Sequence, residues 1–166
     1  MKFTEAQLEQ AFIELLEKEA YTHLLGEAIQ RAPEEVLIKE DFKSFLFKKY
    51  EADAITIGEV EAIVRDLERY PASDLYESNK AIMKMISDGF LLKREDRTKK
   101  DIFIQLLDFS IPENNIYKVV NQLEITGFQP RIPDVVVFVN GFPLVVLEFK
   151  SAIREEATIY DAYVQL

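Results

Sequence analysis

The segment from Arg131 to Lys150, RIPDVVVFVNGFPLVVLEFK, decides the fold of this 166-residue chain. Two apolar runs, 135–139 and 144–147, lie on either side of an Asn140-Gly141 pair. Asn-Gly between two apolar runs predicts a tight hairpin turn, and the many β-branched residues favour strands. Strands that read as almost continuously apolar are usually buried on both faces. The segment therefore predicts a buried β-hairpin.

Three ionisable residues stand at the open end of this hairpin: Asp134, Glu148 and Lys150. Because side chains alternate between the faces of a strand, Glu148 and Lys150 share one face. A two-residue loop with regular pairing would set Asp134 opposite Leu147, on the wrong face. An odd loop or a β-bulge would set Asp134 opposite Glu148. If the two acids act together, the hairpin must contain one of these irregularities.

Two carboxylates and a lysine on one face suit the hydrolysis of a phosphodiester. A hard cation such as Mg²⁺ takes oxygen ligands, typically one or two carboxylates and several waters. The bound ion offsets charge on the phosphate and acidifies a water. Acidic and basic residues also end many strands that have no site. Here, however, ionisable groups at the ends of buried strands are costly unless they are paired or metal-bound, which favours a metal-dependent nuclease site.

Two stretches carry a family resemblance: IYKVVNQ at 116–122 and RIPDVVVFVNGFPLVVLEFKS at 131–151. They resemble the amino-terminal endonuclease domain of the restriction (R) subunit of type I restriction–modification enzymes, in the PD-(D/E)xK nuclease superfamily. The part from Asn140 to Ser151 is the most specific, and weaker similarity reaches the first helix, so the resemblance covers most of the chain. It implies that Asp134 and Glu148 are metal ligands and that Lys150 is the catalytic lysine.

The resemblance also implies site residues on two helices. A catalytic glutamine on the helix after the hairpin corresponds to Gln165, and the tyrosine that follows it in the family would lie beyond Leu166. A metal-binding glutamate on the first helix corresponds best to Glu9, with Glu5 as a rival. Gln122 belongs to the similar segment and receives no role.

The activity that this resemblance implies is Mg²⁺-dependent cleavage of double-stranded DNA, with Mn²⁺ as a substitute ion. The implied partners are double-stranded DNA and the modification and specificity subunits. ATP would serve only a motor in the same polypeptide. No Walker A phosphate-binding loop occurs in the sequence, so we expect a single nuclease domain, residues 1–166, truncated at its carboxy-terminal side and separated from its motor.

The composition limits how such a domain could hold DNA. The formal net charge is −10, whereas a self-sufficient DNA-binding domain usually has a basic footprint. We therefore expect other modules to supply most of the DNA affinity. Cysteine is absent, which excludes disulfides and cysteine-based zinc sites. The chain has no apolar run long enough to span a membrane and no signal-peptide pattern, so we expect a cytoplasmic protein without membrane contact.

The remaining sequence predicts an α/β fold, with a mixed sheet of four or five strands flanked by helices. The first helix should run from about Glu5 to Lys18, with a Thr4/Gln7 capping box and an apolar face of Leu8, Ala11, Phe12, Leu15 and Leu16. Apolar stripes at helical spacing predict a helical insertion at about 38–88. Further strands are expected at 90–92, 101–109 and 116–125. The stripes of the insertion, including Leu75 and Met83, should be core.

Three minor features have weaker claims to a function. The basic segment 93–100, with Arg94 in it, is an exposed hairpin turn or a contact for a phosphate backbone. Asp108 has a weak claim as a metal ligand, and His23, the only histidine, is expected to be structural or exposed.

Two alternative functions remain open. The chain could be another PD-(D/E)xK nuclease, of repair or recombination, although the Asn-Gly hairpin argues against it. It could also be a non-catalytic domain that docks subunits of a restriction complex through the helical insertion.

Overall fold

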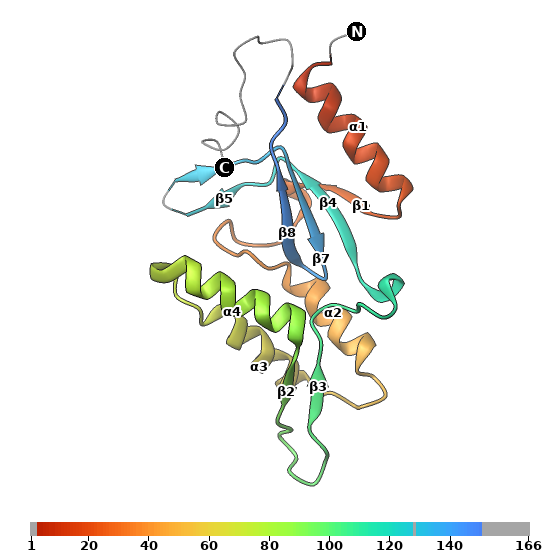
Figure 1. Cartoon of the computed structure of the whole chain (residues 1–166), viewed down its shortest axis with the longest axis vertical. Coiled ribbons are helices and arrows are strands. Elements are labelled where there is room, and N and C mark those ends of the chain that lie inside the picture. Colours follow the sequence, from red (N-terminus) through yellow and green to blue (C-terminus); the bar gives the residue numbers. More distant parts are fainter. Residues whose placement is uncertain (1–2, 128, 151–166) are drawn as a thin grey trace. The chain divides into compact units, whose positions relative to one another are not determined.

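The computed structural model describes residues 3–127 and 129–150 (Figure 1). The described chain divides into two compact units. Unit 1 is discontinuous and takes its described residues from 3–38 and from 116–150, apart from 128. Unit 2 is the continuous segment from Lys39 to Asn115. Residues 39–88 of the expected helical insertion fall in unit 2, which also contains the two strands at 90–92 and 102–104.

A four-stranded mixed sheet forms the centre of unit 1. Its order is β1-β4-β7-β8, where β1 is Thr22–Leu25, β4 is Tyr117–Asn121, β7 is Val135–Val139 and β8 is Phe142–Leu147. Strand β1 runs parallel to β4, and the other neighbours are antiparallel. A short pair, β5 (Ile125–Thr126) and β6 (Pro130–Arg131), lies between β4 and β7 in the sequence. The expected mixed sheet is confirmed, although β1 was not predicted and β4 was predicted to end four residues too late.

The first helix, α1, runs from Glu5 to Lys18 with the Thr4/Gln7 capping box, as predicted. Its buried face differs from the prediction: Ile13 is fully buried, whereas Leu15 is exposed. Phe12, Ile13 and Leu16 pack on one face of the sheet in a cluster with Val119, Val135 and Val137. The face of α1 that meets the sheet therefore runs through Glu9, Phe12, Ile13 and Leu16, which have the i, i+3, i+4, i+7 spacing.

The opposite face of the sheet packs against loop residues of unit 1. Val120, Val136 and Phe138 form a cluster there with Ile38 and Leu123. Residues 135–138 of β7 are buried on both faces, as their apolar run predicted. In β8, however, Leu144, Val145 and Val146 are 37–45% exposed, so the same prediction was wrong for this strand. Among the described residues β8 is an edge strand, with a neighbour on one side only.

The Asn140-Gly141 turn is buried and fastens the two places where the chain leaves and re-enters unit 1. The N–H of Ile38 donates to the carbonyl of Gly141 (2.9 Å). The N–H of Ile116 donates to the side-chain oxygen of Asn140 (2.7 Å), and the N–H of Asn140 donates to the carbonyl of Ile116 (2.8 Å). Both turn residues have positive φ, as a two-residue hairpin turn of this type requires. We call this arrangement the Asn-Gly clasp.

Unit 2 contains three α-helices and one hairpin. The helices are α2 (Lys39–Lys49), α3 (Ile57–Glu68) and α4 (Leu75–Asp88), and the hairpin pairs β2 (Phe90–Leu92) with β3 (Ile102–Ile104). Short 3₁₀ helices occur at Gly26–Ala28 in unit 1, and at Ala72–Asp74 and Pro112–Asn114 in unit 2. The Thr56/Glu59 capping box starts α3, and the capping residue Gly89 ends α4.

The core of unit 2 comes mainly from α2 and α3, through residues such as Phe42, Phe45, Val60 and Ile63. Leu75 and Met83 of α4 are exposed, which corrects their assignment to the core. The strand expected at 101–109 ends at Ile104, because the following residues form a loop built around Asp108. No helix of the described chain is long and apolar enough to cross a membrane.

Candidate active site

The hairpin of β7 and β8 contains the irregularity that the candidate site requires. Val139 pairs with Phe142 across the two-residue turn, and Phe138 pairs with Pro143. Val137 then pairs with Val145 and not with Leu144, so Leu144 is an extra residue in β8. This β-bulge shifts the register by one residue over the rest of the hairpin. The predicted irregularity is confirmed, and it takes the form of a bulge.

The shifted register brings the three candidate residues to one end of the hairpin. Val135 pairs with Leu147, so the next position along the pairing is Asp134 beside Glu148. The side chain of Asp134 accepts a hydrogen bond from the N–H of Phe149 at 2.6 Å. The Asp134 carboxylate therefore lies against the backbone between Glu148 and Lys150.

Glu148 and Lys150 are in direct contact, as two residues on one face should be. The Lys150 ammonium lies 3.2 Å from a carboxylate oxygen of Glu148. Their side chains are 12% and 23% exposed, so the pair is partly shielded from water and still reachable. Because one oxygen of each carboxylate makes these contacts, the second oxygen of Asp134 and of Glu148 could ligate a cation.

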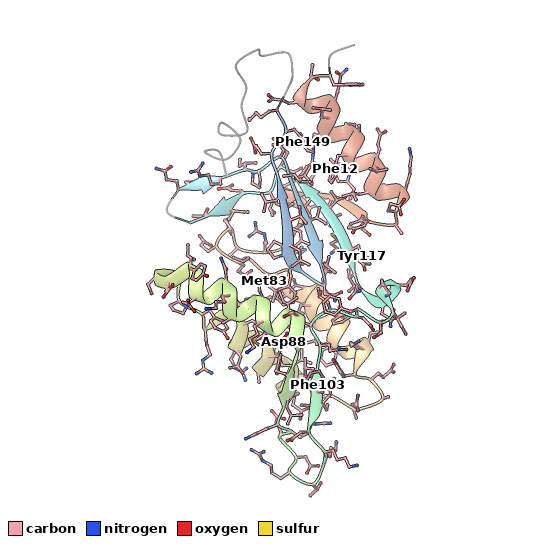
Figure 2. The ribbon with its side chains drawn as sticks, viewed as in Figure 1. Phe12, Met83, Asp88, Phe103, Tyr117 and Phe149 are labelled. Carbon is pink, nitrogen blue, oxygen red and sulfur yellow. The ribbon has the colours of Figure 1, made fainter. Side chains whose placement is uncertain are left out.

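The first helix reaches the same end of the sheet through two contacts. The ring of Phe12 packs against the ring of Phe149 with centroids 5.8 Å apart (Figure 2). One turn earlier on α1, Glu9 accepts a hydrogen bond from the side chain of Asn121 at 2.8 Å. Asn121 pairs with Val135 in the sheet, and Val135 directly follows Asp134. Glu9 thus lies over the strand ends that carry the candidate site.

A hydrogen-bonded row joins Glu9, Asn121 and His23. The side-chain oxygen of Asn121 lies 2.9 Å from Nε2 of His23 on β1. The Glu9 carboxylate can only accept, so the amide nitrogen of Asn121 must face Glu9 and its oxygen must face His23. Nε2 of His23 therefore carries the proton and donates to Asn121. The expectation of a structural His23 agrees with this contact.

The carboxylates fit a site with two protein ligands. Among the described residues, no group of three His, Cys, Asp or Glu side chains lies close enough to hold a metal ion. Two carboxylates are nevertheless sufficient for Mg²⁺, which keeps several of its waters. Glu9 is engaged by Asn121 and does not complete a three-residue group, and Glu5 lies one turn before it on α1. Gln165 and the helix expected around it lie outside the described residues.

The structure gives Asp108 of unit 2 another role. Asp108 is buried and contacts the Lys49 ammonium at 2.7 Å. Hydrogen bonds from Asn114, then from Lys49 and the N–H of Ile111, hold the pKa of Asp108 well below its usual range. Asp108 therefore stabilises the loop to which it belongs.

Asn121 is the site-adjacent residue that sequence reasoning missed. Its signal was an asparagine ending the apolar run of β4, next to the strand that begins after Asp134. No role could be assigned to this residue from sequence because its partners, Glu9 and His23, lie about a hundred positions away.

A mixed α/β sheet with a helix on one face, and acids at the end of a hairpin, is a fold compatible with nucleases. The sequence matches the family described as "Type I restriction enzyme R protein N terminus" over residues 2–166. The chain belongs to that family, which confirms the resemblance found in the sequence.

Relatives agree with this assignment. The chain is 36% identical over 109 residues to the type I restriction enzyme HindI endonuclease subunit of Haemophilus influenzae, a match that covers 64% of this chain and 10% of that protein. It is 35% identical over 95 residues to the putative type I restriction enzyme MjaIXP endonuclease subunit of Methanocaldococcus jannaschii, which covers 54% of this chain and 9% of that protein. The matches span about a tenth of the length of these relatives.

Proposed function

We propose that this chain is the Mg²⁺-dependent endonuclease domain of a type I restriction enzyme R subunit, of the PD-(D/E)xK kind, and that it hydrolyses phosphodiesters of double-stranded DNA. The β-bulge at Leu144 carries the proposal, because it brings Asp134 beside Glu148 and Lys150. Without the bulge, Asp134 would pair with Leu147 and face away from them.

Each residue of the proposed site has a role that its contacts support. Asp134 and Glu148 would hold the cation through their carboxylate oxygens. The cation would supply charge neutralisation at the phosphate and a more acidic water. Lys150, already beside Glu148, would stabilise charge on a non-bridging oxygen or assist deprotonation of the water. The Phe149 N–H fixes the Asp134 carboxylate, so that less of its motion must be lost when the ion binds.

Gln165 is proposed as a further catalytic residue and Glu9 as an additional carboxylate near the ion. The proposal places the domain in the cytoplasm, in a complex with modification and specificity subunits. There an ATP-driven motor elsewhere in the polypeptide would deliver the DNA.

The direct test is Mn²⁺ binding by calorimetry, on this chain and on Glu148→Ala. Glu124→Ala is the matched control, because Glu124 is an exposed glutamate of the same unit. We expect binding in the parent and the control and none in Glu148→Ala. Equal binding in all three proteins would contradict the proposed site.

A docking role for unit 2 is the second candidate, because α4 exposes apolar side chains. Leu75, Tyr76 and Met83 are 55–74% exposed. Asp134→Ala in the full-length subunit separates the two functions: cleavage lost with assembly intact supports the nuclease. Unchanged restriction would leave docking as the function of this domain.

A further inference from the structure

Unit 2 presents a basic loop between β2 and β3. The loop runs from Lys93 to Asp101 and extends beyond the helices of its unit (Figure 1). Its tip is a tight turn in which the N–H of Lys99 donates to the carbonyl of Asp96 at 3.1 Å. The side chain of Asp96 accepts from both the N–H and the hydroxyl of Thr98.

A buried ion pair anchors the base of this loop. The guanidinium of Arg94 lies 2.7 Å from the Glu59 carboxylate, and the two side chains are 3% and 2% exposed. Arg94 also donates to the backbone carbonyls of Asp53 and Ala54. The same Glu59 oxygen accepts from the N–H of Glu95, the next residue of the loop. These bonds fix the base of the loop to the other elements of unit 2.

The anchor removes Arg94 from the phosphate contact that was considered for segment 93–100. Since its guanidinium is buried and fully engaged, Arg94 is not available to a phosphate, and that part of the sequence hypothesis was wrong. Lys93, Arg97, Lys99 and Lys100 are exposed, and none of them forms an ion pair with another described residue.

The acidic residues of the loop accept hydrogen bonds from other groups of unit 2. Asp96 bonds to Thr98, Asp101 accepts from the N–H of Arg94, and Glu95 accepts from the hydroxyl of Thr56. The hydrogen bonds from Thr98, followed by the nearby Lys99, lower the pKa of Asp96, so this side chain stays ionised and bonded to its own turn. The cations are therefore the groups of the loop left to meet a partner.

We propose that the β2–β3 loop is a contact site for the phosphate backbone of double-stranded DNA. The choice of DNA rests on the proposed function, and the loop itself rests on the charges and the anchor. In a chain with a net charge of −10, attraction to a polyanion must be local. A loop held at its base can present several cations at once, with less ordering on binding than a free segment would need.

The test is DNA binding by the full chain at low salt in EDTA, followed by fluorescence anisotropy of a labelled duplex. EDTA separates this test from metal binding, so a failed metal site and a failed loop site give different results. The loop variant combines Lys93→Gln, Arg97→Gln, Lys99→Gln and Lys100→Gln. The control variant combines Lys18→Gln, Arg65→Gln, Lys80→Gln and Lys84→Gln, four exposed cations on helices. Both remove the same amount of positive charge.

We expect the loop variant to bind about 10-fold more weakly or worse, and the slope of log K against log salt to fall by roughly 1 for each phosphate that the loop no longer neutralises. The control should keep the parental slope. In the parent, amide resonances of 93–101 should shift when duplex is added. Equal behaviour of the two variants, or loop resonances that do not move, would overturn the proposal. So would equal binding of poly-glutamate, because the loop would then recognise any polyanion and not a phosphate backbone.

Discussion

Replacement of Arg94 by methionine should strongly destabilise unit 2. The change keeps much of the side-chain volume and removes the guanidinium, which leaves the Glu59 carboxylate buried with no cation beside it. It also removes the donors to the carbonyls of Asp53 and Ala54. Breaking one side of a buried ion pair costs about 3–5 kcal/mol. An exposed pair would cost about 0–1 kcal/mol.

The assay is urea unfolding followed by circular dichroism, on Arg94→Met, Glu59→Gln and the double variant. The neutral amide that replaces Glu59 in the double variant no longer buries a charge, so the double should cost at least about 1 kcal/mol less than the sum of the singles. An Arg94→Met cost below about 1 kcal/mol, or two effects that simply add, would refute the buried anchor. Lys93→Met is the matched control, because Lys93 is exposed beside Arg94 and makes no ion pair with a described residue.

The same anchor predicts a dependence on pH. Burial raises the pKa of Glu59, but hydrogen bonds from the N–H of Thr56, from Arg94 and from the N–H of Glu95 outweigh it and leave the pKa lowered. A carboxyl with a lowered folded-state pKa contributes stability above its unfolded pKa, and this contribution is lost as the pH falls through the folded value. The parent should therefore lose stability below about pH 4.3, the ordinary range of a glutamate. The Glu59→Gln variant should lose less stability over the same fall in pH.

Three further predictions concern other contacts. Gly141→Ala should destabilise unit 1 by about 2 kcal/mol or more, because the residue has a φ of 82° and an added Cβ would lie 2.2 Å from the carbonyl of Ile38; a urea midpoint unchanged from the parent would contradict the Asn-Gly clasp. Asp108→Asn should lose less stability than the parent as the pH falls below about 4, since the lowered pKa of Asp108 contributes stability only while the carboxyl is ionised. Urea midpoints at about pH 7 and about pH 3.5 measure this difference, and an equal loss of stability in both proteins would contradict the prediction. His23 should be protonated at Nε2 when neutral, because it donates to Asn121; imidazole ¹⁵N shifts that place the proton of the neutral ring on Nδ1 would contradict this row of bonds.

Local patterns predicted the elements whose signals are short in range. The capping box at Thr4 placed the start of the first helix correctly, since this signal acts within one turn. Strand β1 was missed because four residues of mixed polarity carry no pattern, and its strand character comes from pairing with β4. Leu15 and Met83 were placed in the core because periodicity identifies a stripe without showing which edge of it is covered.

From the sequence, the candidate site could be predicted only on the condition that the hairpin has an irregular register. The spacing of Asp134 and Glu148 required an odd register, but the sequence could not say whether the turn or a bulge supplies it. In the structure a β-bulge at Leu144 supplies the odd register, because the Asn-Gly turn is held at two residues by its bonds to Ile38 and Ile116. The roles of Gln165 and Glu9 remain predictions that follow from the resemblance.

The Asn-Gly clasp has a consequence for how the chain folds. Pairing β1 with β4 joins segments separated by roughly ninety residues, and closing a flexible loop of that length costs about 3 kcal/mol more than closing one of a few residues. Unit 2 is continuous and can form first, on its own local contacts. Once it has formed, Ile38 and Ile116 are already tethered through a folded body, and the sheet of unit 1 can close around the turn that binds both. During synthesis, the acids of the candidate site can therefore come together only after the last hairpin of the sheet, β7 and β8, has been made.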